Sequence, residues 1–415
     1  MICYRLMSGI VDEIWRSIQE ARSVLRPIIH MTPLDMSMTL SRLSGGRIYL
    51  KLENLQKTGS FKVRGAYYKI WKSSKERSIK VCVAASSGNH AQGVAYASSL
   101  QGIPSIIVMP EHTPVAKVMA TKGYGAKVIL HGATYDESFT KAMEICKKEK
   151  GLFVHPFNDP LVIAGQGTIG IEIYEALRNV DVVLVPVGGG GLISGIAIAL
   201  KKLKPSVKIY GIQPRGAPAM ALSFKERRLV MVRSPDTIAD AVALKKPGDI
   251  TFKIISELVD DMLLVSENDI VKAMLFLLER CKCVAEPAGA LGVAALLGGH
   301  LDVSNKNVAV VISGGNVDMP LLARIIERGL VLEGREVKIR GVLPDRPGML
   351  KEVLEVLAEG KANIITVDHD RISPELSPNK AKVTITMEIY DVTHVKELIE
   401  KLKCKGFEFE FVKSD

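Results

Sequence analysis

The sequence has few aromatic residues and no cysteines at the spacing of a zinc site. Aromatic residues make up 5% of the 415 residues, and the basic residues are scattered through helix-like segments without interleaved aromatics. A nucleic-acid-binding surface is therefore not indicated. Six cysteines occur, at positions 3, 82, 146, 281, 283 and 404. Because most of them lie far apart, we interpret them as reduced core thiols of a cytoplasmic protein.

No segment has the pattern of a secretion signal or a membrane anchor. The N-terminus, MICYRLMSGIVDEIW, lacks an uninterrupted apolar core followed by small residues, which argues against a signal peptide; Met7 is an alternative start to Met1. Residues 182–200 form the longest uncharged run, but Pro186 and four consecutive glycines interrupt it. The run therefore predicts a strand, a loop and a helix, and we expect no association with a membrane.

The composition is that of a globular protein, with 47% hydrophobic and 24% charged residues. Such a chain is long enough for two or three domains with sizeable cores. The net charge of +10 is unevenly distributed, since residues 336–415 carry 13 basic and 15 acidic side chains. The rest of the chain is therefore strongly basic, and a negatively charged ligand would be favoured there.

Residues from about 80 to 325 alternate short β-branched runs with helix-like stretches. Examples of the runs are VCVAA, SIIVM, VVLVPV and VAVVISG. This order is typical of βαβ units and predicts an α/β fold with doubly wound, mostly parallel sheets divided into two lobes.

A different pattern begins near residue 335. An alternating strand (EVKIRGVLPD), an amphipathic helix, two strands, a second helix and a final strand (GFEFEFV) follow one another in about 80 residues. The βαββαβ order predicts a ferredoxin-like domain. We therefore expect a first domain over residues 1–330, a linker over 331–335 and a second domain over 336–415.

Three loops follow predicted strands, where the ligands of an open α/β sheet bind. The glycines of VGGGGL (187–192) allow close approach of backbone N–H groups to a phosphate at a helix N-terminus. AASSGNHAQG (84–93) and VISGGN (311–316) offer hydroxyl and amide groups. Each loop alone is also consistent with an ordinary glycine turn or helix cap.

Lys62 lies in the stretch TGSFKVRGA, directly after an aromatic residue. On its own such a lysine is more often a solvated surface charge. Together with one phosphate loop and converging donors, it indicates pyridoxal 5′-phosphate held as an imine. Imine formation requires a lowered lysine pKa, which desolvation and neighbouring cations can produce.

The motifs SFKVRGA, SSGNHAQGVA, GGGGL and SGGN, in this order and spacing, resemble those of the fold-type II pyridoxal-phosphate enzymes. The resemblance is to the threonine dehydratase (threonine ammonia-lyase) and serine racemase branch in particular. Residues 10–330 resemble its catalytic region. Residues 336–415, which contain LPDRPGML, resemble an ACT regulatory domain.

The resemblance implies a role for each matched residue. Lys62 would hold the cofactor covalently and remove the Cα proton, and Phe61 would flank the pyridine ring. Asn89 would hydrogen-bond the phenolic oxygen, and Ser313 would contact the pyridine nitrogen. The residues that would bind the phosphate through backbone N–H groups are Gly188, Gly189, Gly190, Gly191 and Leu192.

The resemblance also implies a substrate loop, formed by Ser86, Ser87, Gly88, Asn89 and His90, that binds the substrate carboxylate. Ser87 occupies the position of the opposite-face acid or base of the racemase branch. Glu286, in CVAEPAGA, matches a family motif; its role stays open, and a helix cap is an equally good interpretation. Gln213 and Ala219 stand where some relatives have carboxylates, so we expect no divalent metal there.

The implied reaction is β-elimination of L-threonine to 2-oxobutanoate and ammonia, with some activity on L-serine. The ACT-like domain implies an effector, isoleucine first and then valine or a nucleotide. The family implies a homo-oligomer, a dimer or a tetramer. The sequence leaves open a serine dehydratase or racemase, a threonine or cysteine synthase relative, and a non-catalytic amino-acid sensor. It also leaves open whether the role is biosynthetic or catabolic.

Overall fold

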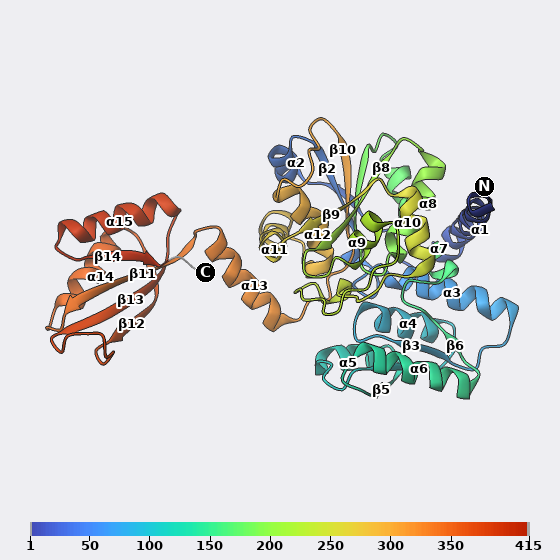
Figure 1. The fold of residues 1–415 in the computed structure, drawn as a ribbon, viewed down its shortest axis with the longest axis horizontal. Coiled ribbons are helices and arrows are strands. Elements are labelled where there is room, and N and C mark those ends of the chain that lie inside the picture. Colours follow the sequence, from blue (N-terminus) through green and yellow to red (C-terminus); the bar gives the residue numbers. More distant parts are fainter. Residues whose placement is uncertain (1, 413–415) are drawn as a thin grey trace. The chain divides into compact units, whose positions relative to one another are not determined.

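The computed structural model describes residues 2–412, without the side chains of residues 2–8 and 392. The chain divides into two compact units, one that ends at Asp318 and one that begins at Met319 (Figure 1). The first unit contains two sheets and the second contains one. The predicted α/β class with mostly parallel sheets and a C-terminal ferredoxin-like domain is confirmed.

The larger sheet of the first unit has the strand order β1-β2-β10-β7-β8-β9, and only β1 is antiparallel to its neighbour. Its strands are β1 (Leu34–Met36), β2 (Arg47–Leu52), β7 (Val182–Pro186), β8 (Lys208–Pro214), β9 (Asp261–Val265) and β10 (Asn307–Ile312). All five residues of β7 are buried, as expected of a strand that helices cover on both faces.

The smaller sheet is entirely parallel, with the order β5-β4-β3-β6. Its strands are β3 (Cys82–Ala85), β4 (Ser105–Met109), β5 (Lys127–Leu130) and β6 (Leu152–Phe153). Residues of β3 alternate between two hydrophobic clusters: Cys82 and Ala84 pack in the cluster that contains helix α4, and Val83 and Ala85 pack in the cluster that contains helix α6. The sheet is therefore covered on both faces.

Each strand of the first unit is followed by a helix, and several of the helices begin at a side-chain cap. The helices of the first unit are α1 (Ile2–Leu25), α2 (Met38–Ser44), η1 (Glu53–Leu55), α3 (Lys62–Glu76), α4 (Asn89–Leu100), α5 (Val115–Gly123), α6 (Tyr135–Glu149), α7 (Pro160–Ala176), α8 (Gly191–Leu203), α9 (Ala219–Glu226), η2 (Asp240–Val242), α10 (Asp249–Leu258), α11 (Glu267–Cys281) and α12 (Pro287–Leu297). Asp159 caps α7 and accepts hydrogen bonds from its first N–H groups. Thr134 and Glu137 form a capping box at α6.

Parallel pairing brings the predicted loops together. In β2 and β10, Leu52 pairs with Ile312, so both strands end at the same edge of the larger sheet. Ser60 and Gly314 form an isolated bridge just beyond that edge. Strand β7, on the other side of β10, also ends at this edge. The sheet thus sets the segments that contain Lys62, Gly188 and Ser313 around one point.

The second unit has the order β11-α14-β12-β13-α15-β14 after helix α13 (Met319–Leu332). Its antiparallel sheet, β12-β13-β11-β14, consists of β11 (Glu336–Pro344), β12 (Asn363–Asp370), β13 (Lys380–Glu388) and β14 (Phe409–Val412). Buried and exposed residues alternate along β11, so one face of the sheet packs on the core that α14 (Met349–Glu359) and α15 (Val392–Cys404) help to form.

Two expectations differ from the structure. The compact units divide at residues 318 and 319, before the expected linker 331–335, because α13 continues to Leu332 and contacts β11. The interpretation of the cysteines as core thiols is wrong for Cys404, which is exposed on α15, whereas Cys82 and Cys283 are buried free thiols; the side chain of Cys3 lies outside the described residues.

In the described part of the chain, no helix is long and apolar enough to cross a membrane.

Candidate active site

The glycine loop between β7 and α8 is built for close approach of a ligand to its backbone. Gly190 precedes α8 with a φ of 94°, a left-handed conformation that favours glycine. A Cβ atom on Gly189 would lie 2.3 Å from the ring of Phe157, and one on Gly191 would lie 2.9 Å from the Phe157 backbone. Side chains are therefore excluded, and the N–H groups at the start of α8 form a cradle for an anion.

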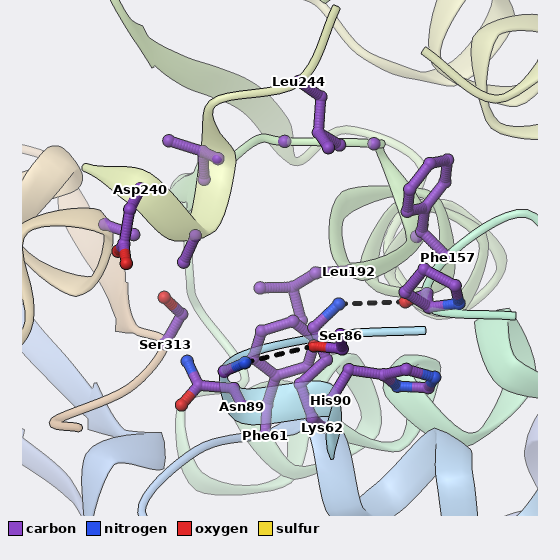
Figure 2. Close-up of a pocket in the computed structure, with 18 of the residues that line it drawn as sticks. Phe61, Lys62, Ser86, Asn89, His90, Phe157, Leu192, Asp240, Leu244 and Ser313 are labelled. Carbon is purple, nitrogen blue, oxygen red and sulfur yellow. Dashed lines mark hydrogen bonds between the residues drawn. The ribbon is translucent and has the colours of Figure 1, made fainter. Parts of the chain in front are cut away.

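Lys62 is the first residue of α3 and points into the pocket (Figure 2). Its Nζ donates a hydrogen bond to the carbonyl oxygen of Pro156 at 2.9 Å and lies 5.1 Å from the ring centroid of Phe61. Burial lowers the pKa of Lys62 to about 8, although the nearby Glu286 carboxylate acts in the opposite direction. The amine is therefore far more nucleophilic at neutral pH than an exposed lysine.

The segment Ser86 to His90 leads from β3 into α4. No side chain caps this helix; Gly88 is the capping residue, and its N–H donates to Ser86 Oγ at 3.2 Å. Ser86 thus forms a turn just before the helix, but no side chain accepts a hydrogen bond from the helix's own first N–H groups. The first N–H groups of α4 are left without a side-chain acceptor, which suits a carboxylate ligand.

His90 and Glu286 are buried with shifted pKa values. His90 Nε2 donates to the carbonyl oxygen of Val154 at 2.8 Å. Burial, followed by the charge of Lys62, lowers the pKa of His90 to about 3, so its imidazole is neutral. Burial, followed by the charge of Asp240, raises the pKa of Glu286 to about 7. Glu286 Oε1 accepts a hydrogen bond from Asn89 Nδ2 at 2.7 Å.

Ser313 follows β10 and is buried. Its carbonyl oxygen accepts from the Phe61 N–H at 3.1 Å, so the segment before Lys62 is fixed to the segment after β10. Figure 2 shows Asn89 and Ser313 on one side of the Phe61 ring and His90 on the other. Hydroxyl, amide and amine groups thus line the same pocket as the Phe61 ring.

One pocket brings the predicted site residues together. The predicted residues that line it are Phe61, Lys62, Ser86, Ser87, Gly88, Asn89, His90, Gly188, Gly189, Gly190, Gly191, Leu192 and Ser313. Glu286, whose role was left open, also lines it. Sequence reasoning did not single out Lys117, Tyr135, Phe157, Asp240 or Asn316, which line it too. Asn316 ends the quoted motif SGGN, whereas the others stand in no motif.

Lys117 of α5 connects two segments of the first unit at the pocket. Its Nζ lies 2.9 Å from Asp240 Oδ2 and 3.3 Å from Asp318 Oδ2. Burial lowers the pKa of Lys117, but the carboxylates of Asp240 and Asp318 outweigh this and raise it. Lys117 therefore lines the pocket as a charged side chain, whereas Lys62 has a lowered pKa.

A buried ionic cluster lies under the start of α3. Its members are Lys51, Glu53, Arg64 and Glu172, each at most 7% exposed. Arg64 Nη2 lies 2.7 Å from Glu53 Oε1, and Lys51 Nζ lies 2.6 Å from Glu172 Oε2. Arg64 also donates to Glu172 of α7. The charges balance, so the cluster fixes the first turn of α3, which carries Lys62, without leaving a net buried charge.

Gln213 and Ala219, the positions expected to lack a metal, have ordinary packing. Gln213 Oε1 accepts a hydrogen bond from the N–H of Ala221 at 2.8 Å, in the first turn of α9. The amide of Gln213 therefore serves to hold that helix. The absence of a divalent metal stays a prediction.

Comparison with known proteins points in the same direction as the geometry. The family model described as pyridoxal-phosphate dependent enzyme matches residues 25–314, and an ACT domain model matches residues 333–404. An L-threonine ammonia-lyase of Thermotoga maritima is 51% identical over 395 residues, which are 95% of this chain and 98% of that protein.

Two solved structures have similar folds. The processed form of threonine deaminase isoform 2 from Solanum lycopersicum superimposes with a TM-score of 0.73 and 38% identity, covering 76% of this chain and 88% of that one. Maize serine racemase superimposes with a TM-score of 0.72 and 36% identity, covering 76% of this chain and 97% of that one.

Proposed function

The chain belongs to the pyridoxal-phosphate-dependent enzymes and carries a C-terminal ACT domain, and from this premise we propose that its pocket converts L-threonine to 2-oxobutanoate and ammonia. The enzyme is a threonine ammonia-lyase that uses pyridoxal 5′-phosphate. The observation that carries this conclusion is the convergence of the Lys62 amine, the glycine cradle and Ser313 in one pocket. The 51% identity to an L-threonine ammonia-lyase over 95% of the chain agrees with it.

The pocket residues fit the cofactor. The cradle of Gly188 to Gly191 has no room for a side chain at Gly189 and presents backbone N–H groups to a phosphate. Phe61 would lie against the pyridine ring, Asn89 would donate to the phenolic oxygen, and Ser313 would contact the ring nitrogen. When bound, the cofactor withdraws electrons from the substrate Cα and so acidifies its C–H bond.

Lys62 is the group that takes the Cα proton in this proposal. A base must be neutral before it accepts a proton, and an amine with a pKa of about 8 is neutral in about one molecule in ten at pH 7. An unperturbed lysine would be neutral in fewer than about one in a thousand. The β-hydroxyl takes up a proton as it leaves, so the Cα proton and the hydroxyl are together lost as one water molecule, and hydrolysis of the released enamine yields 2-oxobutanoate and ammonia.

The N-terminus of α4 would hold the substrate carboxylate. The segment Ser86 to His90 presents N–H groups there that no side chain caps, and His90 is neutral because of its lowered pKa. Recognition of the carboxylate therefore depends on N–H and O–H donors and not on a full positive charge at His90.

Ser313 offers a hydroxyl, which does not stabilise a protonated pyridine nitrogen as a carboxylate does. This favours elimination over prolonged negative charge at Cα.

The test of this function is release of 2-oxo acid from L-threonine and from L-serine, measured separately on the holoenzyme. We expect faster release of 2-oxobutanoate from threonine and a slower, detectable release of pyruvate from serine. Absence of oxo acid from both substrates would contradict the assignment.

A second candidate function, serine racemisation, has one observation in its favour. Ser87 lines the pocket, at the position of the opposite-face acid or base in the racemase branch. Accumulation of D-serine from L-serine, at a rate above pyruvate release, would favour this alternative. The ACT domain favours the dehydratase.

The ACT domain is the basis for a regulatory proposal. We expect isoleucine, and less strongly valine, to inhibit by binding this domain of a homo-oligomer, a dimer or a tetramer. Initial rates of 2-oxobutanoate release should therefore fall severalfold as isoleucine is added, and removal of residues 319–415 should abolish the response. Kinetics that are identical with and without both amino acids would argue against this effector class.

A cytoplasmic location is part of the same proposal. Cys82, Cys146, Cys281, Cys283 and Cys404 are free thiols, which is the usual state of cysteines in a reducing compartment.

A further inference from the structure

Three side chains of the pocket form a hydrogen-bonded chain that begins at a backbone carbonyl group. Asn316 Nδ2 donates to the carbonyl oxygen of Thr58 and to Asn89 Oδ1, both at 2.8 Å. Asn89 Nδ2 in turn donates to Glu286 Oε1 at 2.7 Å. The four residues come from the segments before α3, at the start of α4, before α12 and after β10. The amide of Asn89 therefore joins the segments of Asn316 and Glu286, and Asn316 in turn joins it to the segment of Thr58.

The carbonyl oxygen of Thr58 fixes which groups donate and which accept along this series of hydrogen bonds. A side-chain amide can rotate by half a turn and exchange its oxygen for its NH2 group, but the carbonyl oxygen of Thr58 can only accept. The NH2 group of Asn316 must therefore face Thr58, and its second N–H then faces Asn89 Oδ1. A rotated Asn89 would place its NH2 group against that of Asn316, and two donors would then face each other. Its oxygen would also face Glu286, which repels it whenever the carboxyl group is ionised.

Gly59 gives an independent reason to regard Asn316 as closely fitted. Gly59 has a φ of 69°, and a Cβ atom there would lie 2.3 Å from Asn316 Oδ1. The oxygen side of the Asn316 amide is thus packed against bare backbone. Any side chain at position 59 would displace Asn316 from Asn89, which explains the glycine of the TGSFK segment better than turn geometry alone.

We propose that Asn316 is a positioning residue that orients the amide of Asn89 so that its NH2 group, and not its oxygen, is offered to the phenolic oxygen of the cofactor. This inference rests on the proposed function, since it presumes that the pocket binds pyridoxal 5′-phosphate. In Figure 2 the amide nitrogen of Asn89 lies on the side that faces Ser313. One of its two N–H bonds is used by Glu286, so the other is the donor left for a ligand.

The orientation of Asn89 matters for the electronic state of the cofactor as well as for its binding. A hydrogen-bond donor beside a phenolic oxygen stabilises the ionised form of that oxygen, whereas a carbonyl oxygen in the same place repels it. Loss of Asn316 should therefore change the visible absorbance of the bound cofactor. A role that is only structural would lower stability and leave the spectrum unchanged.

The test compares Asn316→Ala and Asn316→Asp with the wild-type holoenzyme. We expect Asn316→Ala to bind pyridoxal 5′-phosphate about tenfold more weakly, the cost of one good hydrogen bond to an ionised group, and to show a shifted visible spectrum. Asn316→Asp should have a larger effect, about a hundredfold, because carboxylate oxygens would face both Thr58 O and Asn89 Oδ1. Because aspartate has nearly the same shape as asparagine, Asn316→Asp also tests the proposal if Asn316→Ala fails to fold.

Asn54→Ala is the matched control. Asn54 Nδ2 also bridges to another segment near the pocket, since it donates to the Val284 carbonyl oxygen at 3.0 Å and to Cys283 Sγ at 3.1 Å, but Asn54 is not among the residues that line the pocket. We expect Asn54→Ala to lower the melting temperature and to keep the wild-type spectrum. The double variant Asn89→Ala/Asn316→Ala should bind the cofactor no more weakly than Asn89→Ala alone, because Asn316 acts through Asn89.

Wild-type spectra and affinities in both Asn316 variants would overturn the inference while leaving the proposed function intact. Additive losses in the double variant would also overturn it. A wild-type protein that gains no visible absorbance with added pyridoxal 5′-phosphate would overturn the proposed function and the inference together.

Discussion

Replacement of Lys62 by alanine is expected to lower kcat for L-threonine by about 10,000-fold, because one substitution would remove both the proposed attachment point of the cofactor and the proposed base. Lys62 has the lowered pKa, about 8, that both tasks require. The measurement is 2-oxobutanoate release at saturating threonine and cofactor. The visible absorbance due to covalent attachment should disappear at the same time.

Lys75→Ala is the control for this experiment. Lys75 lies on the same helix, α3, but is exposed, so its loss should change kcat by less than twofold. Turnover by Lys62→Ala at a rate close to that of Lys75→Ala would show that another group removes the proton, and the assignment of the pocket would then fail.

Replacement of Arg64 by alanine is expected to destabilise the first unit by about 3–5 kcal/mol, the usual cost of removing one partner from a buried ion pair. Arg64 is fully buried, and its loss would leave Glu53 and Glu172 with Lys51 as their only cation in the cluster. The free energy of unfolding in urea is the measurement, at one fixed concentration of cofactor, because bound cofactor itself stabilises the folded state.

Two further variants show whether this cost arises from burial. Arg22 pairs with Glu175 at the surface, so Arg22→Ala should cost less than about 1 kcal/mol. Arg64→Lys keeps the charge but loses the forked geometry and should fall between the two. If Arg64→Ala were as stable as Arg22→Ala, the cluster would not be the anchor of α3.

The sequence predicts which segments line the pocket because each of these segments has a local pattern. Lys62, the tetraglycine and Ser313 each stand in a short segment whose composition already suits one part of the cofactor. Each segment also follows a strand or precedes a helix, and these were recognisable from their hydrophobic pattern. The parallel sheet then places the ends of such strands at one edge.

The residues that sequence reasoning missed depend on distant partners. Asp240 faces Lys117 across 123 positions of the chain, and neither residue stands in a distinctive segment. Arg64 in a first helical turn looks like a solvated charge until Glu53 and Glu172 are seen to enclose it. The pairing of β2 with β10, which brings the TGSFK and SGGN segments together, joins residues 47–52 to 307–312. No local pattern contains that information.

The position of Asp318 gives the Lys117 ion pair a consequence for the response of the enzyme to salt. Asp318 is the last residue before α13, so the covalent path from the second unit enters the first unit at a carboxylate paired with a pocket residue. Electrostatic coupling at partly exposed groups weakens as dissolved ions screen it, over a Debye length of about 8 Å at physiological ionic strength. Concentrated salt would therefore weaken the Lys117–Asp318 ion pair, whereas the buried ionic cluster around Arg64 would be little affected.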